Sequence, residues 1–193
     1  MSLLFPLREP RDAEERDQRA MELALAEARR AYAAEEVPVG AVVVRGNQVL
    51  GRGANAVEAL GDATAHAEMI AITQAFAAAG EKRLEGAELY CTLEPCIQCV
   101  GALLHARVAR LVYGAADPKF GGVESLARLL ELPGLNHRVE ARGGVLAEES
   151  AALLQDFFRR RRAEQRAARA AEASPASGPD APGDGSESPP AER

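Results

Sequence analysis

Aromatic side chains make up only 4% of the 193 residues, although hydrophobic residues reach 47%, with alanine prominent among them. The chain lacks any apolar run of about 18 residues, the length that a membrane-spanning helix requires. Its start, Met1 to Pro6, is too short and too soon followed by charge to form a signal peptide. We therefore expect a cytoplasmic protein with no membrane segment, of a length that fits one ordinary domain with tails.

Cysteine is also scarce, and its placement is informative. The three cysteines are Cys91, Cys96 and Cys99. An odd number without a signal peptide argues against a disulfide scaffold. A Cys-x-x-Cys pair in a cytoplasmic chain more often binds a metal or takes part in redox chemistry.

The chain also lacks an excess of positive charge, because its net charge is -6 and its isoelectric point is near 5.2. Taken as a whole, that charge is not typical of a nucleic-acid-binding protein. The distribution is uneven, however: residues 159–162 with Arg166 and Arg169 form a basic block that only Glu164 opposes. The sequence therefore allows a local basic face on an acidic protein.

Hydrophobic periodicity predicts helices that alternate with short strands. Helices are expected over residues 17–34, 64–79, 95–106, 123–132 and 146–170, and strands over residues 39–44, 49–54, 87–93, 108–113 and 137–141. Thr64 is expected to cap the second helix, and Pro95 suits the first turn of the third. The alternation predicts an α/β protein, a three-layer α/β/α sandwich with a central five-stranded mixed sheet.

The ends of the chain are expected to lie outside this sandwich. Residues 1–15 are interpreted as a flexible arm and residues 16–170 as the folded domain. Residues 171–193 consist mainly of Ser, Pro, Gly, Ala and acidic residues, a composition that cannot bury enough surface to fold. We expect that tail to be disordered.

Two short segments carry residues typical of metal chemistry: Thr64–Glu68, which contains His66, and Thr92–Cys99. Cys96 and Cys99 are three residues apart and share one face of a helical turn. Both lie near a predicted helix N-terminus, where the helix dipole favours a thiolate. With His66 they offer Zn²⁺ three protein ligands and leave a fourth position open, as in catalytic rather than structural zinc sites.

Glu68 stands two residues after His66. Such positions do not share a helix face, so both serve one pocket only if the end of the helix points into it. A carboxylate beside the metal could then accept a proton from water and pass it on. His-x-Glu followed by Pro-Cys-x-x-Cys is the signature of zinc deaminases that act on nucleobases.

Other interpretations of these residues remain open. Cys91 could close a structural zinc site as a fourth ligand, although it lies inside a predicted strand. A redox-active Cys-x-x-Cys would leave His66 and Glu68 unexplained. His105 is interpreted as a helix-end or packing residue, with a role beside the substrate as the alternative.

Around these motifs the chain resembles the bacterial tRNA-specific adenosine deaminases of the cytidine deaminase-like superfamily. The likeness covers about residues 17–162 and rests on these segments: Glu36–Val42, His66–Glu68, Leu93–Cys96, Gly101–Arg107, Asp117–Lys119, Asn136–Glu140 and Ala151–Arg159. The metal segments are common to the superfamily. Asn136–Glu140 and Asp156–Arg159 are the parts that point to the tRNA branch.

The resemblance implies a function. Zn²⁺ would be held by His66, Cys96 and Cys99, and Glu68 would carry protons in the hydrolytic deamination of the wobble adenosine of a tRNA anticodon to inosine. It also implies a homodimer whose sites lie close to the subunit interface. The residues that it places against the substrate or the anticodon stem-loop are Asn55, Asp117, Lys119, Phe157 and Arg159.

Two rival functions follow from the same residues. A deaminase of a free base or nucleoside, of guanine or cytosine type, would share all the zinc chemistry, but the tRNA-like segments after Asp117 argue against it. A non-catalytic zinc module that binds RNA would not need Glu68 or the open fourth position.

Overall fold

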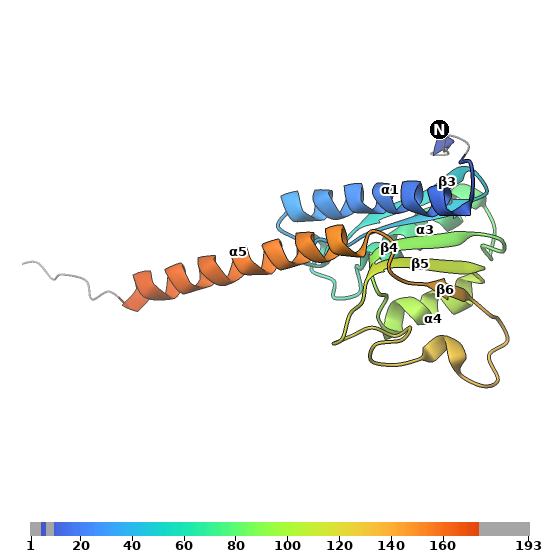
Figure 1. Cartoon of the computed structure of the whole chain (residues 1–193). Coiled ribbons are helices and arrows are strands. Elements are labelled where there is room, and N and C mark those ends of the chain that lie inside the picture. Colours follow the sequence, from blue (N-terminus) through green and yellow to red (C-terminus); the bar gives the residue numbers. More distant parts are fainter. Residues whose placement is uncertain (1–4, 7–9, 174–193) are drawn as a thin grey trace, which may run out of the picture. The chain divides into compact units, whose positions relative to one another are not determined.

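The structure is a computed structural model that describes residues 5–6 and 10–173 of the chain (Figure 1). In chain order its elements are β1 (Phe5–Pro6), α1 (Ala13–Ala33), β2 (Gly40–Arg45), β3 (Gln48–Ala54), α2 (Val57–Leu60), α3 (Ala67–Ala79), β4 (Glu88–Leu93), α4 (Ile97–Ala106), β5 (Arg110–Ala115), the 3₁₀ turn η1 (Leu129–Glu131), β6 (Glu140–Arg142) and α5 (Ala147–Ala173). Most predicted elements are present, with ends displaced by a few residues.

The strands form one sheet in the order β1-β3-β2-β4-β5-β6. Strand β2 pairs antiparallel with both β3 and β4, whereas β4, β5 and β6 run parallel. The predicted five-stranded mixed sheet is confirmed. The two-residue strand β1 adds a short sixth member at the edge, where Phe5 pairs with Val49.

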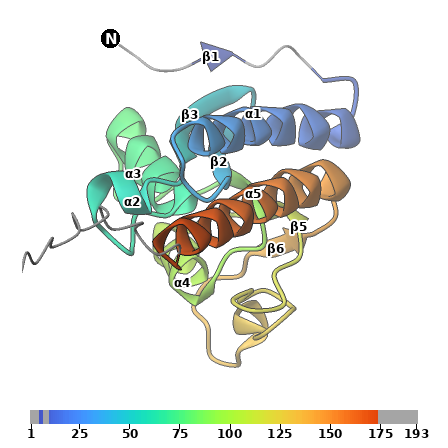
Figure 2. The same cartoon turned by 90° about the vertical axis from the view of Figure 1, so that its left-hand side faces the viewer.

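Alternate residues of the strands point to opposite faces of the sheet, and each face has its own apolar core. Ala41 and Val43 of β2 belong to a cluster shared with α3 and α4. Val42 and Val44 belong to a second cluster shared with α1, which includes Met21. Helices therefore cover both faces, as Figures 1 and 2 show, and the predicted α/β/α sandwich is confirmed.

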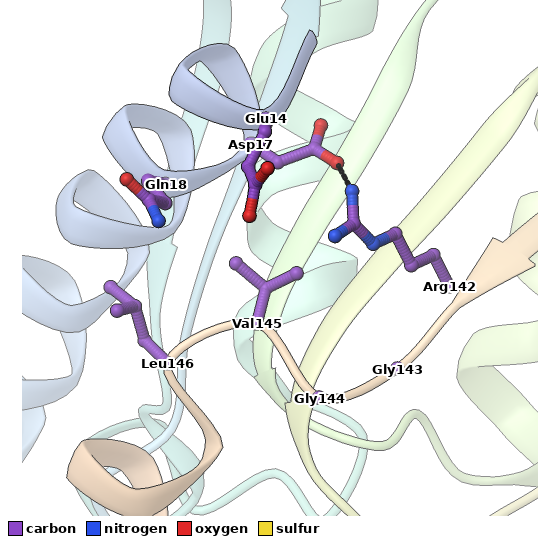
Figure 3. A pocket seen from close by; sticks show the side chains of 8 residues that line it. All are labelled: Glu14, Asp17, Gln18, Arg142, Gly143, Gly144, Val145 and Leu146. Carbon is purple, nitrogen blue, oxygen red and sulfur yellow. Dashed lines mark hydrogen bonds and ion pairs between the residues drawn. The ribbon is translucent and has the colours of Figure 1, made fainter.

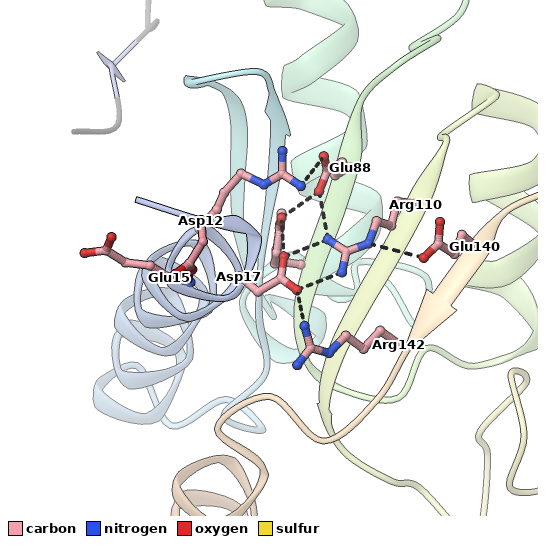
Figure 4. Close-up of polar contacts among 9 residues, drawn as sticks. Asp12, Glu15, Asp17, Glu88, Arg110, Glu140 and Arg142 are labelled. Atoms are coloured by element: carbon pink, nitrogen blue, oxygen red, sulfur yellow. Dashed lines mark hydrogen bonds and ion pairs between the residues drawn. The ribbon is translucent and has the colours of Figure 1, made fainter. Parts of the chain in front are cut away.

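A buried ionic network ties α1 to the beginning of β4 and to the strands beside it (Figure 4). Asp17 of α1 is only 1% exposed and accepts two hydrogen bonds from the Arg110 guanidinium, at 2.6 and 2.7 Å. It accepts further bonds from Arg142 at 2.9 Å and from the Tyr90 hydroxyl at 3.0 Å. Because α1 begins at Ala13 rather than at Asp17 as predicted, this carboxylate lies inside the helix and can reach the sheet.

The helix predicted over residues 123–132 is wrong. The segment forms turns, followed by the 3₁₀ turn at Leu129–Glu131. The backbone N–H groups of Val123, Glu124 and Ser125 all donate to one carboxylate oxygen of Glu94. These N–H groups are bound to a carboxylate from a distant part of the chain, and such an acceptor is invisible to local periodicity.

The described residues as far as 159 form one compact unit, and those from 160 onward form a second. The described part of the second unit, residues 160–173, is helical and contains an Arg160–Glu164 ion pair at 3.6 Å. Most of the predicted disordered tail, residues 174–193, lies outside the described residues, and the predicted domain limits stay a prediction. Among the described residues no helix is long and apolar enough to cross a membrane.

Candidate functional site

The beginnings of two helices bring the predicted metal ligands together. His66 is the N-cap of α3 and Cys96 is the N-cap of α4, both with extended backbone. The prediction that Thr64 caps the first of these helices is wrong, since His66 occupies that position and makes no side-chain capping hydrogen bond. Neither N-cap side chain is used to hold its own helix, so both are free to serve a shared site.

The spacing of the three side chains fits zinc. The Nδ1 atom of His66 lies 3.5 Å from Cys96 Sγ and 3.4 Å from Cys99 Sγ, and the two sulfurs are 3.8 Å apart. Tetrahedral bonds of about 2.3 Å to sulfur and about 2.0 Å to nitrogen would place sulfurs about 3.8 Å apart and sulfur and nitrogen about 3.5 Å apart. The residues present therefore fit a zinc ion without rearrangement.

The three side chains of the cluster shift one another's pKa. A hydrogen bond from Cys99, aided by His66, lowers the pKa of Cys96 to about 4, although burial opposes the charge. The same hydrogen bond, with burial, raises the pKa of Cys99, while the bond to Cys96 raises the pKa of His66. Cys96 is therefore the thiol of the pair that ionises more readily, as a metal ligand must.

Glu68 lies in the first turn of α3 and is only 4% exposed. Burial raises the pKa of its carboxyl above the ordinary value, while the neighbouring His66 works in the opposite direction. A carboxyl with a raised pKa holds a proton more readily than a free one, which suits a group that accepts a proton and then returns it. Because α3 starts at the cluster, its first turn holds His66 and Glu68 in one place despite their i, i+2 spacing.

Cys91 does not complete the cluster. In the described part of the chain, the set of side chains whose ligand atoms lie within 4.8 Å of one another contains His66, Cys96 and Cys99 alone. Cys91 is fully buried in β4, and burial together with the nearby Glu68 raises the pKa of its thiol. The arrangement favours three protein ligands over a closed four-ligand site.

Asn55 follows β3 directly and is 7% exposed. Its side-chain amide donates to Glu36 Oε2 at 3.2 Å, and the neighbouring Ala56 N–H donates to Ala65 O, just before His66. The fully buried Glu36 also accepts backbone N–H groups from the turn that contains α2. Asn55 is therefore held at the edge of the sheet where α3 begins.

Asp117 and Lys119 lie in the loop that follows β5. Asp117 Oδ1 accepts the Lys119 N–H at 2.9 Å, so this carboxylate shapes its own turn, and Lys119 is exposed. The buried carboxylate of Glu94, which is 2% exposed, binds this loop and accepts the Asp117 N–H. Burial opposes a charge on Glu94, but hydrogen bonds from the loop, with those of Glu124 and Ser125 foremost, outweigh it and hold its pKa below the ordinary value.

The two aromatic residues of α5 lie in different environments. Phe157 is 3% exposed and packs edge-on against Tyr32 of α1, with ring centroids 5.7 Å apart. Phe158 is 43% exposed, and the exposed Arg159 pairs with Asp156. Burial leaves little of the Phe157 side chain available to a ligand, so Phe158 is the better candidate of the pair for contact with RNA.

A small pocket of about 150 Å³ opens elsewhere, between the start of α1 and the segment after β6 (Figure 3). It is lined by Glu14, Asp17, Gln18, Arg142, Gly143, Gly144, Val145 and Leu146. None of the predicted metal or substrate residues belongs to it. Asp17 and Arg142, which line it, point toward each other and form an ion pair. The pocket therefore lies beside the ionic network and not at the metal cluster.

Sequence reasoning gave no role to three residues that support the site. Glu36 and Glu94 are buried acids that hold neighbouring loops, and Gln98 donates from α4 to Thr64 O at 3.0 Å, joining the two ligand segments. Both acids lie in the segments that carry the family likeness. Their partners, however, come from parts of the chain that spacing alone could not connect to them.

Comparison with known proteins agrees with this geometry. The family described as "Cytidine and deoxycytidylate deaminase zinc-binding region" matches residues 14–115, so fold and site together define a zinc-binding deaminase. A tRNA-specific adenosine deaminase of Agrobacterium fabrum is 49% identical over 142 residues, which are 74% of this chain and 93% of that protein. One from Aquifex aeolicus is 46% identical with the same coverage. The chain belongs to the tRNA-specific adenosine deaminase family.

Solved structures support the same placement. A structure described under A-to-I editing by tRNA:A34 deaminases at the wobble position superimposes with a TM-score of 0.68 and 48% identity, covering 70% of this chain and 99% of that one. A guanine deaminase from Nitrosomonas europaea superimposes with a TM-score of 0.63 but only 25% identity, covering 79% and 87%. The tRNA deaminase is the nearer of these two in sequence and in fold.

Proposed function

We propose that this protein hydrolyses the wobble adenosine of a tRNA anticodon to inosine, with Zn²⁺ held by His66, Cys96 and Cys99. The observation that carries this proposal is a cluster with tetrahedral zinc spacing beside the buried Glu68. Membership of the tRNA-specific adenosine deaminase family supplies the substrate class.

When bound by three protein ligands, zinc lowers the pKa of a water molecule toward neutrality and so supplies the nucleophile. Glu68 accepts the proton that this water loses and delivers it to N1 of adenine as oxygen adds to C6. Glu68, deprotonated again, then takes the remaining proton from the oxygen on C6 and passes it to the exocyclic nitrogen, so that the C6–N bond breaks, ammonia leaves and the C6 carbonyl forms. Adenosine and water thus become inosine and ammonia, and the raised pKa of Glu68 suits both transfers.

The substrate base has to be unstacked before this chemistry can take place. An anticodon loop offers a splayed base at low cost, whereas a duplex does not. Asn55 orients the purine from the end of β3, where Glu36 holds its amide. Asp117 and Lys119 in the loop, with Arg159 on α5, contact the stem-loop, so binding should weaken as salt is raised.

The partners follow from the same proposal. The protein binds a tRNA anticodon stem-loop, acts in the cytoplasm and forms a homodimer with sites near the subunit interface. Exposed apolar side chains suited to such an interface include Leu60, Ile97 and Leu126, with exposed fractions of 64%, 54% and 56%. Sedimentation of the purified protein tests the dimer.

The experiment for the activity compares an anticodon stem-loop carrying wobble adenosine with free guanine, cytosine and adenosine. We expect inosine in the RNA and no product from the free compounds. Glu68→Gln should keep its zinc content and lose turnover by about 10³-fold or more, since general acid–base groups contribute about 10² to 10⁴. Cys96→Ala should lose zinc.

The second candidate is deamination of a free base, favoured by the similarity to the Nitrosomonas europaea guanine deaminase. It would be selected if guanine were deaminated and the stem-loop were not. Tight RNA binding without any product would instead select a non-catalytic zinc module. Full activity in Glu68→Gln would contradict the proton-transfer role.

A further inference from the structure

The carboxylate of Glu94 is enclosed by a loop that it does not belong to. Glu94 is 2% exposed and stands between the last residue of β4 and the metal-ligating segment of α4. The loop runs from Asp117 to Ser125, more than 20 positions later in the chain. No role in metal binding or proton transfer is available to Glu94, because its oxygens are already occupied by this loop.

The occupation is extensive. Glu94 Oε1 accepts the N–H groups of Val123, Glu124 and Ser125 at 3.1, 2.8 and 3.0 Å. Oε2 accepts the Asp117 N–H at 3.0 Å and the Ser125 hydroxyl. Hydrogen bonds to a charged acceptor in a buried site are among the stronger ones in proteins. One side chain therefore fixes both ends of the Asp117–Ser125 loop.

The middle of the loop is built for this close approach. A Cβ placed on Gly121 would collide with the Glu94 carboxylate, so only glycine fits there. Gly121 also pairs with Cys96 in an isolated β-bridge, and the Gly122 N–H donates to Pro95 O at 2.8 Å. The loop thus rests directly against the backbone of a metal ligand.

The outer side of the same loop is exposed. Lys119 and Phe120 lie there, and Phe120 is 65% exposed. The N–H groups of both residues are held by Asp117 Oδ1. The inner side of the loop is bound to Glu94, and its outer side presents a cation and an aromatic ring next to the metal cluster.

We propose that Glu94 is a positioning residue that prearranges the Asp117–Ser125 loop to receive RNA beside the metal cluster. This inference rests on the proposed function, because the loop needs a nucleic-acid partner for its placement to matter. Glu94 acts through the loop: it sets the affinity for the anticodon stem-loop and leaves the chemical step alone. If the loop is already ordered in the free protein, binding RNA does not have to supply the free energy of ordering it, and the affinity is higher.

The test uses the zinc-loaded full chain and a synthetic anticodon stem-loop with wobble adenosine. Glu94→Gln keeps the shape of the side chain but turns an NH₂ group toward the Asp117 N–H or the amides at 123–125. We expect KM to rise about 10-fold, the effect of losing about one hydrogen bond to a charged group, with kcat changed less than about threefold. Hydrogen exchange at residues 117 and 123–125 should accelerate while zinc content stays full.

Binding is measured separately from turnover in protein that carries the inactivating Glu68→Gln substitution. In this background, Glu94→Gln should raise the Kd for the stem-loop by the same factor as it raises KM. The matched control is Tyr90→Phe. Tyr90 is a buried residue of β4 whose hydroxyl donates a hydrogen bond to Asp17, and the substitution removes that hydroxyl. It should lower the melting temperature and leave KM unchanged, which separates general destabilisation from loop placement.

If Glu94→Gln does not fold, Ser125→Ala removes one donor to Oε2 and should raise KM in the same direction by a smaller factor. An unchanged KM in both variants, or a loss of zinc and kcat that matches the loss of affinity, would overturn the proposal. Wild-type protein that neither binds nor deaminates the stem-loop would refute the proposed function instead. The two failures are therefore distinguishable.

Discussion

The carboxylate of Glu36 accepts a hydrogen bond from the side-chain amide of Asn55, with a distance of 3.2 Å between Oε2 and Nδ2. Both residues are buried, with exposed fractions of 2% and 7%. An amide that donates to a carboxylate in a buried site has its orientation fixed, because reversing it would bring two oxygens together. Asn55, the residue proposed to orient the purine, is therefore itself held in one orientation by Glu36.

Glu36→Gln should lower kcat/KM on the stem-loop about 10-fold, because the replacement leaves the Asn55 amide free to turn and one loop N–H unsatisfied. The free energy of unfolding should fall by about 1 to 3 kcal/mol, the cost of a buried polar group without its partner. Steady-state kinetics and urea denaturation measure the two effects.

A double-mutant cycle with Asn55→Ala isolates the pair. If Glu36 acts through Asn55, the loss in kcat/KM for the double variant should be clearly smaller than the two single losses combined. Additive losses would show that the two residues act separately, and Glu36 would then matter only for the turn containing α2.

Close packing of α3 on β3 gives a second prediction. A Cβ on Gly53 would collide with the carbonyl oxygen of Ala67, at the start of α3. Gly53→Ala should displace His66 and weaken zinc binding about 10-fold or more, as disturbed support of metal ligands does. Competition with a chelator measures this loss.

Gly101→Ala is the matched control for that variant. Gly101 lies within α4, and a Cβ there would meet open space. Alanine should stabilise this helix by about 0.5 to 1 kcal/mol and leave zinc affinity unchanged. Similar zinc affinity in the two variants would contradict a role for the β3–α3 packing in placing His66.

The Asp17 network predicts how stability depends on pH. Burial opposes the charge on Asp17, but Arg110, Tyr90 and Arg142 outweigh it and hold its pKa below the ordinary value. A depressed carboxyl pKa contributes stability above the pKa of the unfolded chain, about 3.9, and that contribution is lost as the pH falls through the lower, folded value. Folded protein should therefore lose stability as the pH is taken below about 4.

Asp17→Asn should lose about 3 kcal/mol of stability at neutral pH, because it removes the buried carboxylate that binds the half-buried Arg110 and the more exposed Arg142. It should also lose less than the wild type on acidification. Glu22→Gln, an exposed position of α1 outside the pocket that Asp17 and Arg142 line, is the control and should follow the wild-type curve. Parallel curves for Asp17→Asn and wild type would refute the linkage. Thermal unfolding at a series of pH values provides the measurement.

The neighbouring phenylalanines of α5 should separate stability from RNA binding. Phe157→Ala should cost about 3 kcal/mol, because it removes a buried ring packed against Tyr32. Phe158→Ala should change stability little and weaken stem-loop binding about 10-fold, the order expected for a ring that stacks on a base. Equal RNA affinity in Phe158→Ala and wild type would exclude that contact.

Local patterns in the sequence were sufficient for most of the fold. The short β-branched run at residues 39–44 predicted β2, and helical periodicity predicted α1, because each signal depends on residues close together in the chain. The metal cluster was predictable for a similar reason. His66 and the Cys96–Cys99 pair each begin a helix after a loop or strand, so a compact motif described both halves.

What the sequence did not reveal depends on partners distant in the chain. The helix predicted over residues 123–132 failed because Glu94 gathers the N–H groups of this segment. The role of Glu36 was missed because its partners lie 19 to 23 positions away. A buried carboxylate binds the loop that the fold places beside it. Hydrophobic periodicity does not predict contacts between segments so far apart in the chain.

The two N-caps of the candidate metal site, His66 and Cys96, belong to helices whose bodies are packed against the sheet, whereas the exposed side chains Lys119 and Phe120 of the loop after β5, and Phe158 of α5, lie outside that packing. Reactivity and recognition are thus supported by separate parts of the chain. Replacement of the outer segments could redirect the same reactive centre to a different nucleobase compound, which agrees with a guanine deaminase sharing this architecture at 25% identity. For protein engineering, substrate selectivity should be altered in the loop after β5 and on the exposed side of α5, while the N-terminal ends of α3 and α4 should be left intact.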